Sequence, residues 1–455
     1  MDRQQNQFYG RERLIREIVS GALAPQPASY SLVGSKLAGK SSLLEYLASP
    51  DGPLLGDDSA DLRPYAFQDA GRIVVTQIDC AWQEAQQDLL VFLCDRLIRQ
   101  LRTVERIDLD WAAVEGQSSA SRRIWQISRQ LNQMGYRLIL LMDNFDAVFQ
   151  NQLLTPDAID ELRPLTLETA LVVATEHPLH DLDRELAASP LFNVMTQLFV
   201  GLIETEAALR WVHAYCAAYP NILPACDDLL ELTGCHPFLL HRLGDILAEV
   251  QTMLASRQPL GAEHLPLIRL RLAEHGRLLF ATLWRRLQAP PPRIEPAAVM
   301  ALLGRLLAAP LPLNEVTQEQ FAPLNWLINQ AMVIYGAPGY QLFSSLFAEF
   351  LRVRAGDAAA TGAAGNANRG QALFFDSLTK TESALLRYFQ THKHEVVSPE
   401  QLLADVWKRP NASPRRVQEA IRRLRLRLDE ASPPVGVIEN ERGRGYRYVP
   451  ARAER

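Results

Sequence analysis

The octapeptide at positions 34–41 reads Gly34-Ser35-Lys36-Leu37-Ala38-Gly39-Lys40-Ser41 and has the pattern G-x-x-x-x-G-K-S. Residues 30–33 before it favour a strand, and residues 42–47 after it favour a helix. A glycine-rich loop in that context presents backbone N–H groups to an anion at the positive end of a helix dipole. The octapeptide is therefore predicted to hold the phosphates of ATP or GTP.

Individual side chains around this loop have predicted roles at a nucleotide. We expect Lys40 to reach the β- and γ-phosphates and the hydroxyl of Ser41 to hold Mg²⁺, with Ser42 also at the nucleotide. The apolar run 138–142 predicts a strand that ends in Asp143. A carboxylate at that point is suited to hold Mg²⁺ together with Ser41. The expected cofactors are thus ATP or ADP, and Mg²⁺.

Hydrolysis would need a base or a water-positioning group beside the γ-phosphate. Asn144 follows Asp143 directly, and its amide can orient a water molecule but cannot accept a proton. Asp146 stands two residues further on. Either Asp146 or a partner subunit is the alternative source of an acid. Asn144 and Asp146 are the candidate catalytic residues, and we predict tight ATP binding with slow or absent turnover.

Length and composition bound the class of protein. A chain of 455 residues, 48% of them apolar, suits about three globular domains of roughly 150 residues each. No apolar run approaches the roughly 18 residues of a membrane helix, and the first residues lack the apolar centre of a secretory signal. Five cysteines without C-x-x-C spacing favour a reducing, cytoplasmic setting. We expect no membrane association.

Charge is spread unevenly along the chain. The net charge is −5, but residues 373–455 contain 16 Lys and Arg against 11 Asp and Glu. Residues 355–370, shortly before this basic segment, consist mostly of alanine and glycine and predict a flexible tether. The expected linker spans residues 355–371. A basic segment tethered to an acidic body predicts a nucleic-acid partner for the basic segment only.

Upstream of the linker, apolar runs alternate with amphipathic stretches such as 88–101. The runs are nearly continuous, as buried parallel strands are, and they are 30–33, 73–78, 138–142, 171–174 and 198–200. This pattern predicts a parallel sheet with helices on both faces. Residues 204–256 are expected to be helical, and residues 332–343 predict a hairpin around a Gly/Pro turn.

Three short boxes in the first 352 residues resemble STAND and related AAA+ ATPases. F-Y-G-R-E at 8–12 resembles the box that opens these proteins, and T-G-C-H-P-F-L-L at 233–240 resembles a box of bacterial STAND proteins. A-T-E-H-P-L at 174–179 is similar to the sensor segment after the fourth strand. The resemblance implies that Tyr9 and Arg11 lie along the adenine and that Pro237 packs near the nucleotide.

The same resemblance implies that Thr175 lies at the nucleotide. It also exposes two departures from the family pattern. In these families an acid usually follows the Walker B aspartate, which corresponds to Asp143, whereas this chain has Asn144 there. An arginine usually occupies the position of Glu176. An acid facing a γ-phosphate would repel it, so phosphate sensing is either lost or relocated. Both departures disfavour a fast motor.

Residues 413–430 predict a helix with an apolar stripe on one side and arginines on the other. The stripe consists of Val417, Ala420, Ile421, Leu424 and Leu428. Arginine can fork onto guanine or phosphate in a major groove. Residues 437–449 predict a hairpin with Arg442 and Arg444 at its tip.

Residues 376–450 resemble the OmpR/PhoB winged-helix domain of bacterial response regulators. The matching motifs are L-T-K-T-E at 378–382, L-L-A-D-V-W at 402–407, the arginine-rich helix and R-G-R-G-Y-R at 442–447. Such domains usually open with a four-stranded sheet, for which only residues 373–375 are available here. The resemblance implies double-stranded DNA contacts by Arg415, Arg416, Arg422, Arg423, Arg442 and Arg444.

The expected fold is multidomain α/β plus α+β, with a P-loop NTPase parallel sheet, a helical lid, a middle winged-helix module and a C-terminal winged helix-turn-helix. The expected boundaries are 1–203 for the ATPase core, 204–258 for the lid, 259–354 for the middle module and 372–455 for the DNA-binding domain. The expected function is that of an ATP-binding, STAND-like, signal-responsive transcription regulator. Such a regulator could assemble into a nucleotide-dependent homo-oligomer. A sensor ATPase of a bacterial defence system and a DNA-loading or transposition ATPase are the alternatives.

Overall fold

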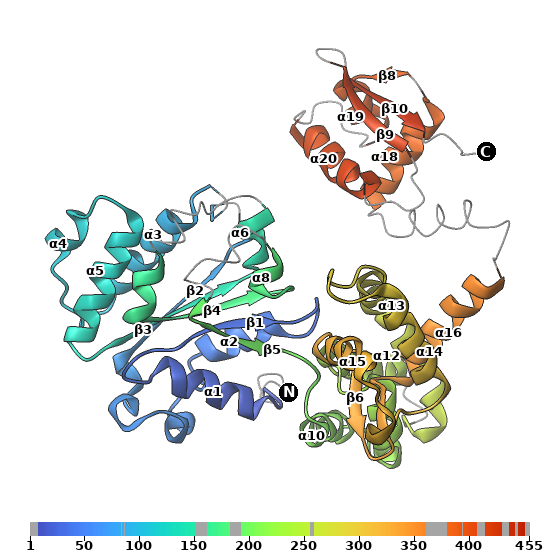
Figure 1. Ribbon diagram of the computed structural model, residues 1–455, viewed down its shortest axis with the longest axis horizontal. Coiled ribbons are helices and arrows are strands. Elements are labelled where there is room, and N and C mark those ends of the chain that lie inside the picture. The colour runs from blue at the N-terminus through green and yellow to red at the C-terminus, as the bar shows by residue number, and fades with distance from the viewer. Residues whose placement is uncertain are drawn as a thin grey trace. The chain divides into compact units, whose positions relative to one another are not determined.

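Figure 1 shows the computed structural model. It describes residues 8–82, 84–85, 87–150, 162–182, 193–254, 259–360, 380–393, 395–406, 415–429, 436–441 and 445–450. The chain divides into two compact units, Met1–Arg352 and Val353–Arg455. Among the described helices, none combines the length and apolar character that crossing a bilayer requires.

The first unit is built on a five-stranded parallel sheet with the order β2-β3-β4-β1-β5. Every residue of β1, β3 and β4 is buried, which explains why most of their residues are apolar. The order places β4 between the strand before the phosphate loop and the strand that ends in Asp143. The strands are β1 (Ser29–Val33), β2 (Ile73–Asp79), β3 (Arg137–Asp143), β4 (Thr169–Thr175) and β5 (Met195–Phe199).

Helices cover both faces of this sheet, as alternate residues of β3 show. Leu138 and Leu140 pack in one hydrophobic cluster with α3 and α5, whereas Ile139 and Leu141 pack in another with α1 and α2. The predicted doubly covered sheet is therefore confirmed. Its helices are α1 (Glu12–Ala22), α2 (Lys40–Ala48), α3 (Leu89–Leu101), α4 (Trp111–Glu115), α5 (Ala120–Gln133), α6 (Asp146–Gln150) and α8 (Leu179–Leu182).

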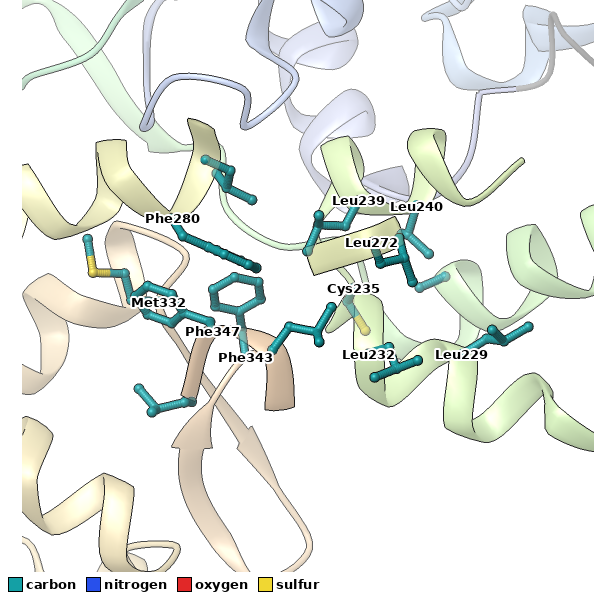
Figure 2. Close-up of a cluster of buried hydrophobic side chains, with 14 of the residues drawn as sticks. Leu229, Leu232, Cys235, Leu239, Leu240, Leu272, Phe280, Met332, Phe343 and Phe347 are labelled. Atoms are coloured by element: carbon teal, nitrogen blue, oxygen red, sulfur yellow. The ribbon is translucent and has the colours of Figure 1, made fainter. Parts of the chain in front are cut away.

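The rest of the first unit is mainly helical and shares one hydrophobic core. Figure 2 shows Phe280, Phe343 and Phe347 at its centre with Leu239 close by. The expected lid and middle module both contribute to this core. Its elements are α10 (Thr205–Cys216), α11 (Cys226–Thr233), α12 (Pro237–Met253), α13 (Leu265–Gln288), α14 (Pro296–Ala308), α15 (Gln318–Asn329), β6 (Val333–Gly336), β7 (Gly339–Leu342) and α16 (Ser345–Ala360).

Helix α16 continues into the segment expected to be a linker and ends at Ala360. The remainder of that segment, 361–371, lies outside the described residues, as do residues 373–375. The predicted hairpin of the middle module is confirmed, because β6 and β7 pair antiparallel from Val333–Leu342 to Gly336–Gly339. Short 3₁₀ segments are Asp57–Leu62, Tyr65–Phe67, Ala70–Arg72, Arg163–Leu167, Pro220–Ala225, Ala262–His264 and Leu313–Glu315.

Beyond the end of α16, the described residues of the second unit form three helices and a three-stranded sheet with the order β8-β10-β9. Val417, Ile421, Leu424 and Leu428 of α20 are buried in its core, as the apolar stripe predicts. The predicted C-terminal hairpin is confirmed by the antiparallel pairing of β9 with β10. The elements are α18 (Lys380–Thr391), β8 (Val396–Val397), α19 (Pro399–Asp405), α20 (Arg415–Asp429), β9 (Gly436–Glu441) and β10 (Gly445–Pro450).

Candidate nucleotide site and DNA interface

The phosphate loop runs from the end of β1 to the first turn of α2. Gly39 has a φ of 81°, a left-handed conformation that glycine adopts without strain, and α2 begins at the next residue. The Lys40 ammonium donates to the carbonyls of Gly34 at 2.7 Å and Ser35 at 3.1 Å. Burial lowers the pKa of Lys40, while the charges of Glu176, Asp146 and Asp143 oppose that shift. The loop carbonyls therefore hold the Lys40 ammonium near the three carboxylates.

Arg11 supports the loop from behind. Its guanidinium donates to the carbonyl of Gly39 at 3.0 Å, to that of Gly201 at 3.0 Å and also to that of Ala38. Its backbone N–H donates to Glu204 at 2.7 Å. Burial lowers the pKa of Arg11 to about 10, against the opposing charge of Glu204. The side chain expected along the adenine therefore ties the loop to the segment between β5 and α10.

A cavity of about 460 Å³ opens in front of the loop, within the size range of small-molecule sites. The loop contributes Lys36, Leu37, Gly39, Lys40, Ser41 and Ser42 to its wall. The remaining wall is largely aromatic and apolar, and it includes Tyr9, Trp211, Pro237 and Phe238. Of the expected nucleotide contacts, Gly34, Ser35, Ala38 and Thr175 do not line this cavity.

Tyr9 and Trp211 form a stacked pair in this wall, with ring centroids 5.3 Å apart and planes inclined by 9°. The glycine between Tyr9 and Arg11 has a φ of 75°, and a Cβ there would lie 2.6 Å from Ile203. Gly10 therefore lets the chain turn closely past α10. Trp211 was not among the residues predicted from the sequence, since an aromatic residue in an amphipathic helix gives no separate signal.

The carboxylates at the ends of β2 and β3 lie in register, because Asp79 pairs with Asp143. Asp143 is buried and accepts the backbone N–H of Asn144 at 2.8 Å. The Asn144 amide donates to Asp79 at 3.0 Å. Asp79 was not predicted, although its strand ends in an aspartate as β3 does. Oxygen ligands suit Mg²⁺. Of the two predicted Mg²⁺ ligands, Ser41 lines the loop cavity and Asp143 does not.

Asp146 faces the end of β4. Its Oδ2 accepts the backbone N–H of Glu176 at 2.8 Å, and its Oδ1 lies 3.9 Å from the ring of His177. Asp146 does not line the cavity, whereas Asn144 does. Thr175 is fully buried, and its carbonyl accepts the N–H of Gly34 at 3.2 Å. Of the two catalytic candidates, Asn144 is therefore the one beside the loop cavity.

Glu176 is held by two cations. Lys36 of the loop approaches its carboxylate at 3.4 Å, and Arg286 of α13 approaches it at 3.6 Å. Arg286 also donates to the Glu176 carbonyl. The negative charge of Glu176 therefore lies beside two compensating cations. Arg286 was not predicted, because no local pattern links α13 to the end of β4.

The DNA-binding candidates all belong to the second unit. Arg422 is exposed on α20, and Arg415, Arg416 and Arg423 lie on the same helix with side chains outside the described set. Arg442 and Arg444 lie outside the described residues. Arg425 instead has a structural role, because its Nε donates to the carbonyl of Ile438 at 2.8 Å and its guanidinium lies 5.8 Å from the ring of Tyr446.

Comparison with known proteins identifies the second unit. Residues 376–448 match the family model described as "Transcriptional regulatory protein, C terminal". This segment is an OmpR/PhoB-type winged-helix domain of the DNA-binding regulator class. No curated protein matches the chain.

Several solved structures resemble the chain. The Walker-type ATPase of Pyrococcus abyssi is 14% identical, with a TM-score of 0.46 over 76% of this chain and 96% of that one. The ORC2 protein of Aeropyrum pernix is 11% identical, with a TM-score of 0.43 over 78% and 98%. The ORC1 protein of the same organism, in complex with DNA, is 11% identical, with a TM-score of 0.33 over 99% and 91%.

Likenesses this distant carry no argument by themselves. The first unit has the P-loop NTPase fold on its own geometry, which combines the parallel strand order with a glycine loop between β1 and α2.

Proposed function

We propose that this protein is a nucleotide-controlled, DNA-binding transcription regulator that resembles STAND ATPases. One observation carries the proposal. A chain whose residues 376–448 match the transcriptional regulatory family also contains a phosphate loop that opens into a cavity of nucleotide size. The first unit would bind ATP or ADP with Mg²⁺, and the second unit would bind double-stranded DNA. Hydrolysis would be slow or absent.

The geometry of the cavity supports a specific orientation of the nucleotide. The phosphates would lie at the start of α2, where backbone N–H groups and Lys40 meet. Ser41 and Asp143 would hold Mg²⁺. The base would lie against Tyr9, Trp211 and Pro237 of the remaining wall, where aromatic and apolar surface suits a purine ring.

DNA binding would rest on the arginines of α20 and of the hairpin tip. An arginine-rich helix in a basic domain favours phosphate and base contacts, and such binding weakens steeply with salt. If the first units assemble when nucleotide binds, several tethered DNA-binding domains would act at a high effective concentration. A nucleotide-dependent homo-oligomer is therefore part of the proposal, as is a cytoplasmic location.

Two variants of the full chain test whether the two activities are separable. Lys40→Ala should lose labelled ATP in the presence of Mg²⁺, because the loop loses its phosphate-binding cation. The double variant Arg422→Ala with Arg423→Ala should lose binding to a labelled duplex while it retains ATP. Equilibrium binding of both ligands to both variants gives the readout.

An arginine outside the DNA-binding set provides the control. Arg285→Ala removes an exposed cation of the first unit and should change neither binding activity. Loss of ATP binding in the Arg422→Ala, Arg423→Ala variant would contradict the two-module account.

A further inference from the structure

A second cavity, of about 510 Å³, is lined by residues from both the sheet and the helical part of the first unit. It shares no described lining residue with the loop cavity, and the proposed function gives it no role. The sheet side contributes the segment after β4 and Phe199 at the end of β5, and the helical side contributes the end of α13 and one face of α15. Its volume is within the range of small-molecule sites.

Gln330, which follows α15 directly, is the clearest indication of a ligand in the second cavity. The residue lines the cavity and is only 3% exposed. Its Oε1 atom accepts no hydrogen bond from any described residue. A buried amide oxygen without a donor is costly, so buried polar atoms in folded proteins almost always have a partner. A ligand that presents an N–H or O–H group would supply the missing donor.

The charges around the second cavity favour an anion. Arg286 and Arg293 both line it, whereas Asp181 is the only carboxylate among the described lining residues. The Asp181 carboxylate lies 3.5 Å from the ring of His180, which lines the cavity too. Arg286 is already engaged by Glu176. Arg293 is exposed, so its guanidinium can turn toward a ligand, and a planar guanidinium pairs well with a planar carboxylate.

Aromatic and proline side chains form much of the remaining wall. Trp326 lines the cavity and is 8% exposed, and Phe199 is 37% exposed at the end of an outer strand of the sheet. Pro290, Pro291 and Pro292 line the cavity in succession. Because proline has a fixed φ and no N–H group, these three residues make a stiff wall without backbone donors. Such a wall suits a flat apolar ring.

We propose that the second cavity is a ligand site, and that its ligand is an aromatic acid that also carries a hydroxyl or ring N–H group. The acid group pairs with Arg293, the ring lies against Trp326 and the prolines, and the donor reaches Gln330. Such a ligand contacts both the sheet side and the helical side of the first unit. It would therefore be a chemical signal separate from the nucleotide, and this inference does not depend on nucleotide binding at the loop cavity.

The probe for this site is 6-hydroxy-2-naphthoate, which combines an acid group, a flat ring and a hydroxyl. Calorimetry on the full chain, with and without saturating ADP and Mg²⁺, should give a Kd below about 1 mM under both conditions. Two matched compounds each lack one feature. The acid without the hydroxyl, 2-naphthoate, and the neutral 6-hydroxy-2-naphthamide should each bind about tenfold more weakly, the expected effect of one lost hydrogen bond in a site that excludes water.

Arg293→Gln tests the contact with the acid group. It should weaken binding of the hydroxynaphthoate about tenfold, because a charge-assisted hydrogen bond is lost, and leave the affinity for the neutral amide unchanged. Arg285→Gln is the matched control, since it removes the same charge from an exposed residue of α13 that does not line the second cavity. It should change neither affinity.

Gln330→Met tests the contact with the donor. Methionine is unbranched and of similar size, and replacing an unpartnered polar group with an apolar one of the same shape is tolerated. The variant should bind the acids with and without the hydroxyl equally well. A purely structural role of Gln330 would instead change both affinities by the same factor and leave their ratio as it is in the parent chain.

Displacement of the hydroxynaphthoate by ADP would place it in the loop cavity and overturn the inference. So would an absence of binding to the parent chain, equal losses in Arg293→Gln and Arg285→Gln, or a parent ratio of the two acids in Gln330→Met. If Gln330→Met fails to fold, the comparison of Arg293→Gln with Arg285→Gln decides. Failure of the parent chain to bind ADP is a different outcome, which contradicts the proposed function, while the naphthoate affinities still decide this inference.

Discussion

Asn144 shows how one side chain sets the chemistry of the cavity. It follows the buried Asp143 and has a left-handed backbone with a φ of 50°, which asparagine tolerates better than most residues. Its amide nitrogen is engaged by Asp79 at 3.0 Å. An amide held in this way can orient a water molecule but cannot take its proton. We therefore expect Asn144 to favour nucleotide binding over turnover.

Asn144→Glu should raise ATP hydrolysis, because a carboxylate beside the γ-phosphate can act as a base. The structure adds a condition, since the new carboxylate would lie beside Asp79 and the two charges would repel each other. The variant that combines Asn144→Glu with Asp79→Asn should therefore show the larger gain, on the order of a hundredfold. Phosphate release at saturating ATP measures it.

Asp79→Asn alone is the control and should leave turnover low. Equal turnover in the double variant and the parent chain would mean that the missing base is not the reason for slow hydrolysis.

His236 gives the first unit a specific dependence on pH. It is fully buried, and its Nδ1 accepts the N–H of Phe238 at 3.3 Å at the start of α12. Burial, reinforced by the charge of Arg11, lowers its pKa from 6.5 to about 3. Between these values the unfolded chain binds a proton at this residue and the folded chain does not.

The free energy of unfolding should therefore fall as the pH falls below 6.5, by up to about 1.4 kcal/mol per pH unit from this residue. His236→Asn keeps an acceptor for the Phe238 N–H and should flatten that dependence. Urea unfolding followed by tryptophan fluorescence measures it. His213→Asn, on the exposed face of α10, should retain the parent slope, and a parent slope in His236→Asn would contradict the account.

At the scale of elements, α20 combines two kinds of arginine. Arg422 is exposed, whereas Arg425 donates to the carbonyl of Ile438 and lies over the ring of Tyr446. The first is suited to DNA and the second fixes the helix against β9 and β10. Arginines of one helix therefore cannot be assigned one role from their composition.

Arg425→Ala should destabilise the second unit by about 1–2 kcal/mol, from one lost hydrogen bond and one cation–π contact. Arg422→Ala removes an exposed side chain, so it should cost less stability than Arg425→Ala and should weaken DNA binding. Thermal unfolding of the full chain, with the transition of the second unit resolved, compares the two variants. Equal destabilisation by both would show that α20 has no division of roles.

The elements also show what could be predicted from the sequence. The five strands, the phosphate loop, both hairpins and the stripe of α20 follow from local patterns, because burial and turn chemistry leave a local signal. The contacts of Arg11, Trp211 and Arg286 could not be predicted, because each depends on how distant elements pack. The partnership of Asn144 with Asp79 needed the register of β2 and β3.

At the scale of the whole molecule, the chain joins two units with opposite charge. The basic second unit is of the DNA-binding regulator class, and the acidic remainder has the P-loop NTPase fold. The composition contrast could be read from the sequence, whereas control of one unit by the other is a property that only measurement on the full chain can establish.

That control is tested most directly by the affinity of the full chain for a labelled duplex at fixed salt, measured with a non-hydrolysable ATP analogue, with ADP and without nucleotide. The account predicts that the analogue changes DNA affinity several-fold relative to ADP in the parent chain and has no effect in Lys40→Ala. Identical DNA affinities under all three conditions in a parent chain that has bound the analogue would contradict it.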